Sequence, residues 1–202
     1  VANVAYLLHE AQADNKHILF EGAQGTFLDI DFGTYPYVTS SSATSGGAAI
    51  GTGMAPVALG TIVGVAKAYT TRVGEGPFPT EFNPDFGKFI REKGHEFGAT
   101  TGRPRRCGWF DAVMVKEAIM LNGISELAIM KLDVLDGLKE VNVCTAYKYK
   151  GKRITSFPYD AQEVSKVVPV YTRMPGWAGP IAHLRRYKDL PAQARDYLAF
   201  LK

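Results

Sequence analysis

Residues 98–111 read Gly-Ala-Thr-Thr-Gly-Arg-Pro-Arg-Arg-Cys-Gly-Trp-Phe-Asp, a stretch whose glycines, proline and threonines predict a shaped loop. The loop carries Arg103, Arg105 and Arg106 within four residues. Guanidinium forks match the geometry of carboxylates and phosphates, and threonine hydroxyls and glycine amides are common partners of anions. A basic turn exposed to solvent would have a similar amino-acid sequence. The flanking glycines and tryptophan, and the apolar helix predicted over 112–121, favour an anion-binding loop instead.

The composition is that of an ordinary globular protein, with 46% hydrophobic and 21% charged residues among 202. A chain of this length buries a substantial core and forms one domain or a large piece of one. The net charge of +3 is too small to indicate nucleic acid as a partner. Two cysteines, Cys107 and Cys144, favour a reducing, cytoplasmic compartment over a disulfide framework. The longest apolar run, 57–65, is interrupted by glycines, so it predicts a buried strand and not a membrane span.

Both ends of the sequence look interrupted. The chain begins at Val1 without methionine or a signal-peptide pattern, and residues 1–13 have the period of an amphipathic helix. Residues 191–202 predict a final helix without a cap. We therefore expect the chain to be an excised piece of a longer protein.

Helix-like and strand-like segments follow one another along the chain, which is typical of an α/β fold. Lysine and glycine at positions 150 and 151 predict the turn of a hairpin, and the strand before it has one apolar face, expected to be half-buried. Asp29 and Asp31 are a closely spaced pair of acidic residues, but we expect them to belong to an ordinary loop and not to a metal site. Expected helices are 1–16, 84–93 and 112–121; expected strands are 17–20, one or two within 57–73, 127–132, 141–149 and 153–155; residues 159–171 are expected to be a polar surface segment.

Two short motifs follow predicted buried strands. After 17–20 comes a Gly-x-x-Gly turn that contains Gln24, and ligands of open α/β sheets bind at such strand ends. At the end of the expected strand 127–132 stands Lys131-Leu132-Asp133. A carboxylate there can accept hydrogen bonds from N1–H and N2–H of guanine, whereas adenine offers an acceptor at N1 and no amine at C2. The lysine stem can lie over the base. Either motif alone is also compatible with an ordinary strand end.

Six stretches together resemble the adenylosuccinate synthetases. In chain order they are FEGAQGT (20–26), GTYPYVTSS (33–41), TRVGEGPFPTE (71–81), GATTGRPRRCGW (98–109), KLDVLDGLKEV (131–141) and MPGW (174–177). The resemblance implies a P-loop-NTPase-like α/β fold, with a mixed, largely parallel sheet flanked by helices and present here as a fragment.

The resemblance also implies an activity: GTP phosphorylates the 6-oxygen of IMP, and the amine of aspartate displaces phosphate to give adenylosuccinate. Phosphoryl transfer of this kind depends on positioning and charge neutralisation, which would explain the arginines. The implied contacts are Gln24, Thr39, Val73 and Arg103 with IMP; Ala99, Thr100, Thr101, Gly102, Arg103 and Arg105 with aspartate; and Arg105, Lys131, Leu132 and Asp133 with GTP.

Other parts of the family pattern are missing from the sequence. The family's general base and acid, its phosphate loop and its magnesium ligands would precede Val1, and a second guanine-binding segment would follow Lys202. We therefore expect residues 1–202 to be the central and C-terminal portion of one domain, without catalytic or metal residues and inactive alone. A homodimer is implied for the parent enzyme. Two alternatives remain at this point, a GTPase-like switch domain and a non-catalytic dimerisation core.

Overall fold

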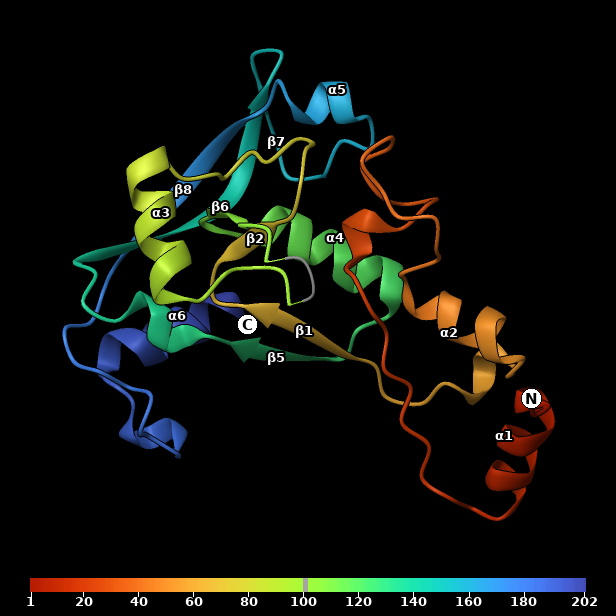
Figure 1. Cartoon of the computed structure of the whole chain (residues 1–202). Helices are drawn as coiled ribbons and strands as arrows, with labels where there is room; N and C mark the ends of the chain where they lie inside the picture. Colours follow the sequence, from red (N-terminus) through yellow and green to blue (C-terminus); the bar gives the residue numbers. More distant parts are fainter. Residues whose placement is uncertain (100–101) are drawn as a thin grey trace.

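The computed structural model describes residues 1–99 and 102–202, and it confirms the α/β class (Figure 1). The longer helices are α1 (Val4–Ala13), α2 (Ser45–Thr52), α3 (Pro84–Lys93), α4 (Ala112–Asn122) and α6 (Ala192–Leu201), with a short α5 (Ala161–Val164). The strands are β1 (Val63–Lys67), β2 (Thr70–Arg72), β3 (Arg106–Gly108), β4 (Phe110–Asp111), β5 (Glu126–Met130), β6 (Glu140–Tyr149), β7 (Lys152–Ile154) and β8 (Val168–Pro175).

The strands pair in three groups. β1 and β5 are parallel, β2 and β3 are antiparallel, and β6 pairs with β4 in parallel and with β7 and β8 in antiparallel fashion. The pairing is therefore mixed, and parallel pairs do not predominate among the described residues. For β6 and β7 the reason is local, because a two-residue turn joins them and strands joined by such a turn pair antiparallel.

The two helices that flank the arginine loop begin and end as predicted. Asn83 caps α3 by accepting a hydrogen bond from the Phe86 amide at 3.0 Å, and the helix ends before Gly94. Asp111 caps α4 in the same way, and Gly123 ends it in the left-handed conformation with φ of 63°. The loop between these helices is consequently held at both ends by well-defined caps.

The predicted hairpin is also confirmed, with Lys150 and Gly151 at φ of 48° and 76° in the turn between β6 and β7. The prediction of one half-buried face is wrong, however, because β6 is buried on both sides. A register shift between Cys144 and Ala146 moves Tyr147 into a different apolar cluster from Val143.

Two other segments differ from expectation. Residues 17–20 form no strand, since none of the described residues pairs with them, and Leu19 is 90% exposed. Residues 159–171 are not merely a polar surface segment: they contain α5 and the start of β8, with Val164 and Val167 buried. The strand β8 includes Pro169, which disfavours a strand, and it forms because it pairs with β6.

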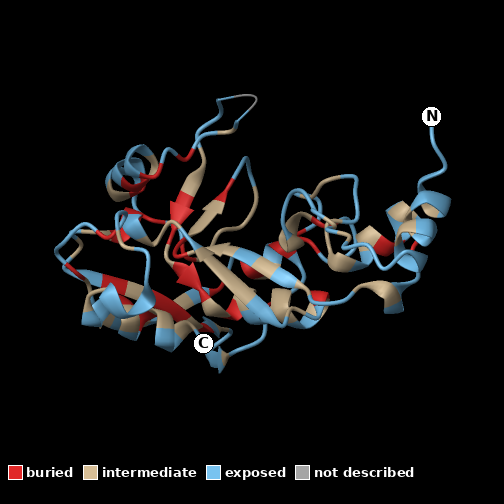
Figure 2. Ribbon diagram, turned by 90° about the horizontal axis from the view of Figure 1, so that it is seen from below, coloured by how far each residue is buried: buried red, intermediate tan, exposed pale blue. Residues whose placement is uncertain are grey.

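Most of the core surrounds β6. One apolar cluster includes Val141, Val143 and Trp177, and a second includes Cys144 and Tyr147. By contrast, α1 contains no buried residue and is drawn in exposed and intermediate colours throughout (Figure 2). Within the part of the chain that the structure describes, no helix has the length and hydropathy required to cross a bilayer.

Candidate functional site

The arginine loop is the tip of a small antiparallel hairpin. The Arg105 amide donates to the Glu96 carbonyl at 2.9 Å, Phe97 and Pro104 form a bridge, and the Gly98 amide donates to the Arg103 carbonyl at 2.8 Å. Thr100 and Thr101, two of the predicted aspartate contacts, lie outside the described residues. Ala99, Gly102 and Arg103 are exposed at the tip, where a ligand can reach them.

Beside the stem of this hairpin, one buried carboxylate gathers several polar groups. Glu96 is 0% exposed, and its Oε2 lies 2.7 Å from both Lys67 Nζ and an Arg105 Nη atom. Its Oε1 accepts a hydrogen bond from the Tyr69 hydroxyl at 2.6 Å and lies 3.6 Å from Lys131 Nζ. Among the described residues, three cations thus contact this one carboxylate, which leaves a local excess of positive charge.

The titration of Glu96 and Lys67 reflects this arrangement. Burial alone would raise the pKa of Glu96, but hydrogen bonds from Lys67, Tyr69 and Arg105 outweigh it and lower that pKa to about 2. Burial lowers the pKa of Lys67, and the contact with Glu96 acts in the opposite direction. Glu96 therefore stays ionised at neutral pH.

The cationic cluster lies where an open α/β sheet binds its ligands. Lys67 is the last residue of β1 and is paired in register with Met130, the last residue of the parallel strand β5. Lys131 follows immediately. Both lysines consequently lie at the carboxyl ends of neighbouring parallel strands, β1 and β5, which run side by side in Figure 1.

Lys131, Leu132 and Asp133 directly follow β5, which ends at Met130, two residues earlier than the predicted strand. Lys131 has a left-handed backbone with φ of 59°, and its ammonium donates to the Gly94 carbonyl. Asp133 is exposed. The turn is held by Asp136, which accepts hydrogen bonds from Trp177 Nε1 at 2.6 Å and from the Ile181 amide at 3.0 Å. The exposed carboxylate of Asp133 therefore stands on an anchored turn.

The other predicted contacts lie on a separate loop, 24–44. Gln24 is exposed in the left-handed region with φ of 61°, and Thr39 is half-buried, its amide bonded to the Leu28 carbonyl at 2.7 Å. Val73 is 45% exposed directly after β2. The predicted residues thus fall into two groups, the hairpin with the β5 turn and this loop with Val73.

Strand β2 connects the two groups. Thr71 accepts a hydrogen bond from Lys67 of the cationic cluster at 2.9 Å. The next residue, Arg72, is buried and donates to the Thr34 hydroxyl and to the Tyr37 carbonyl, both at 3.1 Å. The loop 24–44, which carries Thr39, is therefore held beside Val73 and is connected through β2 to the cationic cluster.

Asp29 fixes the shape of the same loop. It is 1% exposed, and its carboxylate accepts four backbone hydrogen bonds, from residues 31, 32, 43 and 44. Burial would raise the pKa of Asp29, but these four amides lower it. The expectation that Asp29 and Asp31 belong to an ordinary loop is consistent with this arrangement, because every recorded contact of Asp29 is with a backbone amide.

We expect Asp29→Ala to lower the free energy of unfolding by about 2 kcal/mol, because it leaves four backbone amides without their acceptor. The measurement is urea denaturation of the complete polypeptide that contains residues 1–202 (the intact protein). Asp31→Ala is the matched control, since that carboxylate is exposed. Equal stability of the two variants would show that Asp29 does not hold the loop.

The third arginine of the loop is not available for an anion. Arg106 Nε and Nη2 form a two-point ion pair with the Glu81 carboxylate, and Nη1 donates to the Gly76 carbonyl at 2.8 Å. The prediction of three anion-binding arginines is therefore too broad. Glu81 lies 25 residues away in the sequence, and nothing in the sequence around Arg106 identifies it as the partner.

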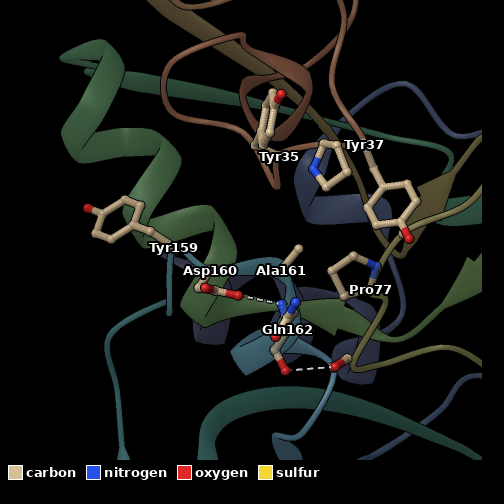
Figure 3. A pocket seen from close by; sticks show the side chains of 10 residues that line it. Tyr35, Tyr37, Pro77, Tyr159, Asp160, Ala161 and Gln162 are labelled. Atoms are coloured by element: carbon tan, nitrogen blue, oxygen red, sulfur yellow. Dashed lines mark hydrogen bonds between the residues drawn. The ribbon is translucent and has the colours of Figure 1, made fainter.

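A pocket of about 770 Å³ lies next to the Thr39 loop, between Tyr35 and Tyr37 on one side and Tyr159 and Asp160 on the other (Figure 3). Among the described residues, its lining contains no lysine or arginine. Asp160 instead caps α5, accepting a hydrogen bond from the Gln162 amide at 2.6 Å. The chemistry of this pocket does not suit a phosphate.

Comparison with known proteins decides the family. The profile of the family described as adenylosuccinate synthetase matches residues 1–202. The chain belongs to the adenylosuccinate synthetase family. It is 55% identical to the adenylosuccinate synthetase of Halothermothrix orenii, covering 100% of this chain and 47% of that protein. It is also 55% identical to that of a Synechococcus strain, covering 100% of this chain and 45% of that protein.

A solved structure agrees with this family assignment. The structure described as fully ligated adenylosuccinate synthetase from Plasmodium falciparum superimposes with a TM-score of 0.97 and 42% identity, over 100% of this chain and 48% of that one. The chain thus spans about half the length of the relatives it matches. These matches do not support the assignment of the chain to the C-terminal portion of an adenylosuccinate synthetase.

Two residues of the cationic cluster were not predicted as part of the site, Lys67 and Glu96. Lys67 lies inside the segment 57–73, for which the sequence predicts one or two strands without giving a boundary at this residue, and the structure ends β1 there. Glu96 could not be found from the local sequence, since two of its partners, Lys67 and Lys131, lie about 30 residues away in the sequence on either side. The described residues contain no group of three histidine, cysteine, aspartate or glutamate side chains suited to a metal ion.

Proposed function

We propose that the protein ligates IMP and L-aspartate to adenylosuccinate with GTP as the phosphoryl donor, through 6-phosphoryl-IMP, and that residues 1–202 contribute binding groups. The observation that carries this proposal is the excess of cations at the carboxyl ends of β1 and β5, directly beside the arginine hairpin. Membership of the adenylosuccinate synthetase family supports the same reaction.

The proposed contacts follow the two groups of residues. On the hairpin and the β5 turn, Ala99, Gly102 and Arg103 take aspartate, and Arg105 reaches both aspartate and GTP. Lys131, Leu132 and Asp133 take GTP, with the exposed Asp133 carboxylate accepting the two guanine donors. On the other side, Gln24, Thr39, Val73 and Arg103 take IMP. The predicted aspartate contacts Thr100 and Thr101 belong to the same proposal.

The chemistry assigned to these residues is positioning and charge neutralisation. Guanidinium and ammonium groups offset the charge on the transferring phosphoryl group and hold the aspartate amine close to carbon 6 of the purine. In the first step, the 6-oxygen of IMP attacks the γ-phosphorus of GTP, and GDP leaves. In the second step, the amine adds to carbon 6 and phosphate leaves with the former 6-oxygen.

Magnesium commonly accompanies such a transfer in nucleotide-dependent enzymes. The described residues do not fit that role, since no cluster of three candidate ligands occurs among them. No step is therefore assigned to a metal held by these residues. We further propose a cytoplasmic location, in keeping with two free buried cysteines, and a homodimer, which the family resemblance implies.

The proposal is tested with IMP labelled with ¹⁸O at position 6. The intact protein, incubated with this IMP, aspartate and GTP, is expected to form adenylosuccinate and to transfer the label to inorganic phosphate. ATP in place of GTP should give little product. Residues 1–202 alone should give none, because the residues proposed here bind substrates and none transfers a proton. Product without label in phosphate, or no product from the intact protein, would overturn the proposal.

A further inference from the structure

Glu96 is buried, ionised and in contact with two residues of the proposed GTP site, yet it is too enclosed to touch a ligand. Its two oxygens hold different partners. Oε2 binds Lys67 and Arg105, whereas Oε1 binds Tyr69 and lies near Lys131. Arg105 and Lys131 keep 28% and 37% of their side chains exposed, so each can meet a ligand while it remains attached to Glu96.

We propose that Glu96 is a positioning residue, which fixes the Arg105 guanidinium and the Lys131 ammonium in the orientation that binds the nucleotide. This inference rests on the proposed function, because it takes Arg105 and Lys131 to be contacts of GTP. The backbone supports it: the same residue closes the hairpin stem through its carbonyl, which accepts from the Arg105 amide at 2.9 Å. Glu96 thus fixes both ends of Arg105.

A second role for Glu96 would be simple neutralisation of the surrounding cations. The two roles predict opposite changes in GTP affinity when the carboxylate is removed. If the carboxylate only offsets positive charge, its removal raises the local positive potential and strengthens the binding of a polyphosphate. If it orients the cations, its removal lets long side chains adopt other rotamers, and binding weakens because that freedom must be lost again when GTP binds.

The test measures the Kd of GTP by titration calorimetry on the intact protein at constant salt. Glu96→Gln is expected to raise the Kd about tenfold. Glu96→Asp keeps the charge but withdraws the carboxylate by one methylene, so it is expected to raise the Kd severalfold. The KM of GTP should rise in parallel while kcat changes much less. Glu81→Gln, which breaks the Arg106 ion pair outside the site, is the control and should leave the Kd unchanged.

Tighter or unchanged binding in Glu96→Gln, or wild-type binding in Glu96→Asp, would overturn the positioning role. Circular dichroism shows whether each variant folds. If neither does, Tyr69→Phe removes one hydrogen bond to Glu96 and should raise the Kd two- to threefold, and a folded Tyr69→Phe with wild-type Kd would refute the inference. Wild-type protein that neither binds GTP nor turns over would refute the proposed function instead.

Discussion

In the intact protein, Asp133→Asn is expected to lower the catalytic efficiency with GTP about a hundredfold and to raise that with xanthosine triphosphate. The asparagine amide replaces one acceptor by a donor, so an N–H group faces an N–H group of guanine, at a cost of roughly 3 kcal/mol. Xanthine carries a carbonyl where guanine has its N2 amine, and the new amide can donate to it. The measurement is the ratio of kcat/KM values for the two nucleotides.

The matched control is Asp196→Asn, which changes an exposed carboxylate on α6 in the same manner. Its nucleotide ratio should equal that of the wild type. Asp133 is exposed on a turn anchored by Asp136, so asparagine is not expected to disturb folding there. An unchanged ratio in Asp133→Asn would mean that this carboxylate does not recognise the base, and the turn after β5 would be an ordinary strand end.

Local signals predicted much of the fold and the outline of the site. The cap at Asn83 and the stops at Gly94 and Gly123 determine the bounds of α3 and α4, because capping depends on residues within one helical turn. The turn at Lys150 and Gly151 determines the β6–β7 hairpin for the same reason. The arginine loop and the Lys131-Leu132-Asp133 motif are likewise predicted from residues that are neighbours in the sequence.

Features that depend on distant partners were not predictable. Residues 17–20 have the composition of a strand, but a strand also needs a neighbour, and the described residues provide none. Residues 168–175 contain prolines at positions 169 and 175, yet they pair along most of β6. The local sequence predicts anion binding for Arg106, whose guanidinium is instead paired with Glu81, and it indicates no role for Glu96, which gathers Lys67, Arg105 and Lys131. In the last three cases, at least one deciding contact joins residues more than 20 positions apart in the sequence.

Arg103 allows the aspartate side of the proposal to be tested separately from the nucleotide side. In the intact protein, Arg103→Leu is expected to raise the KM of aspartate about ten- to a hundredfold and to change the KM of GTP little. The reason is the loss of a charge-assisted contact with a carboxylate, which is worth roughly 1.5–3 kcal/mol. Arg103 is exposed at the tip of the hairpin, and its carbonyl, which closes the loop, is retained by leucine.

Arg153→Leu, an exposed arginine on β7, serves as the control for the loss of one surface guanidinium and should leave both constants unchanged. Because Arg103 is also proposed to contact IMP, a smaller rise in the KM of IMP is expected in Arg103→Leu. In the Glu96 variants, the KM of GTP should rise more than the KM of aspartate, since Glu96 holds Arg105 and Lys131. If Arg103→Leu instead raised the KM of GTP and left that of aspartate unchanged, the hairpin tip would belong to the nucleotide and the proposed aspartate contacts would be wrong.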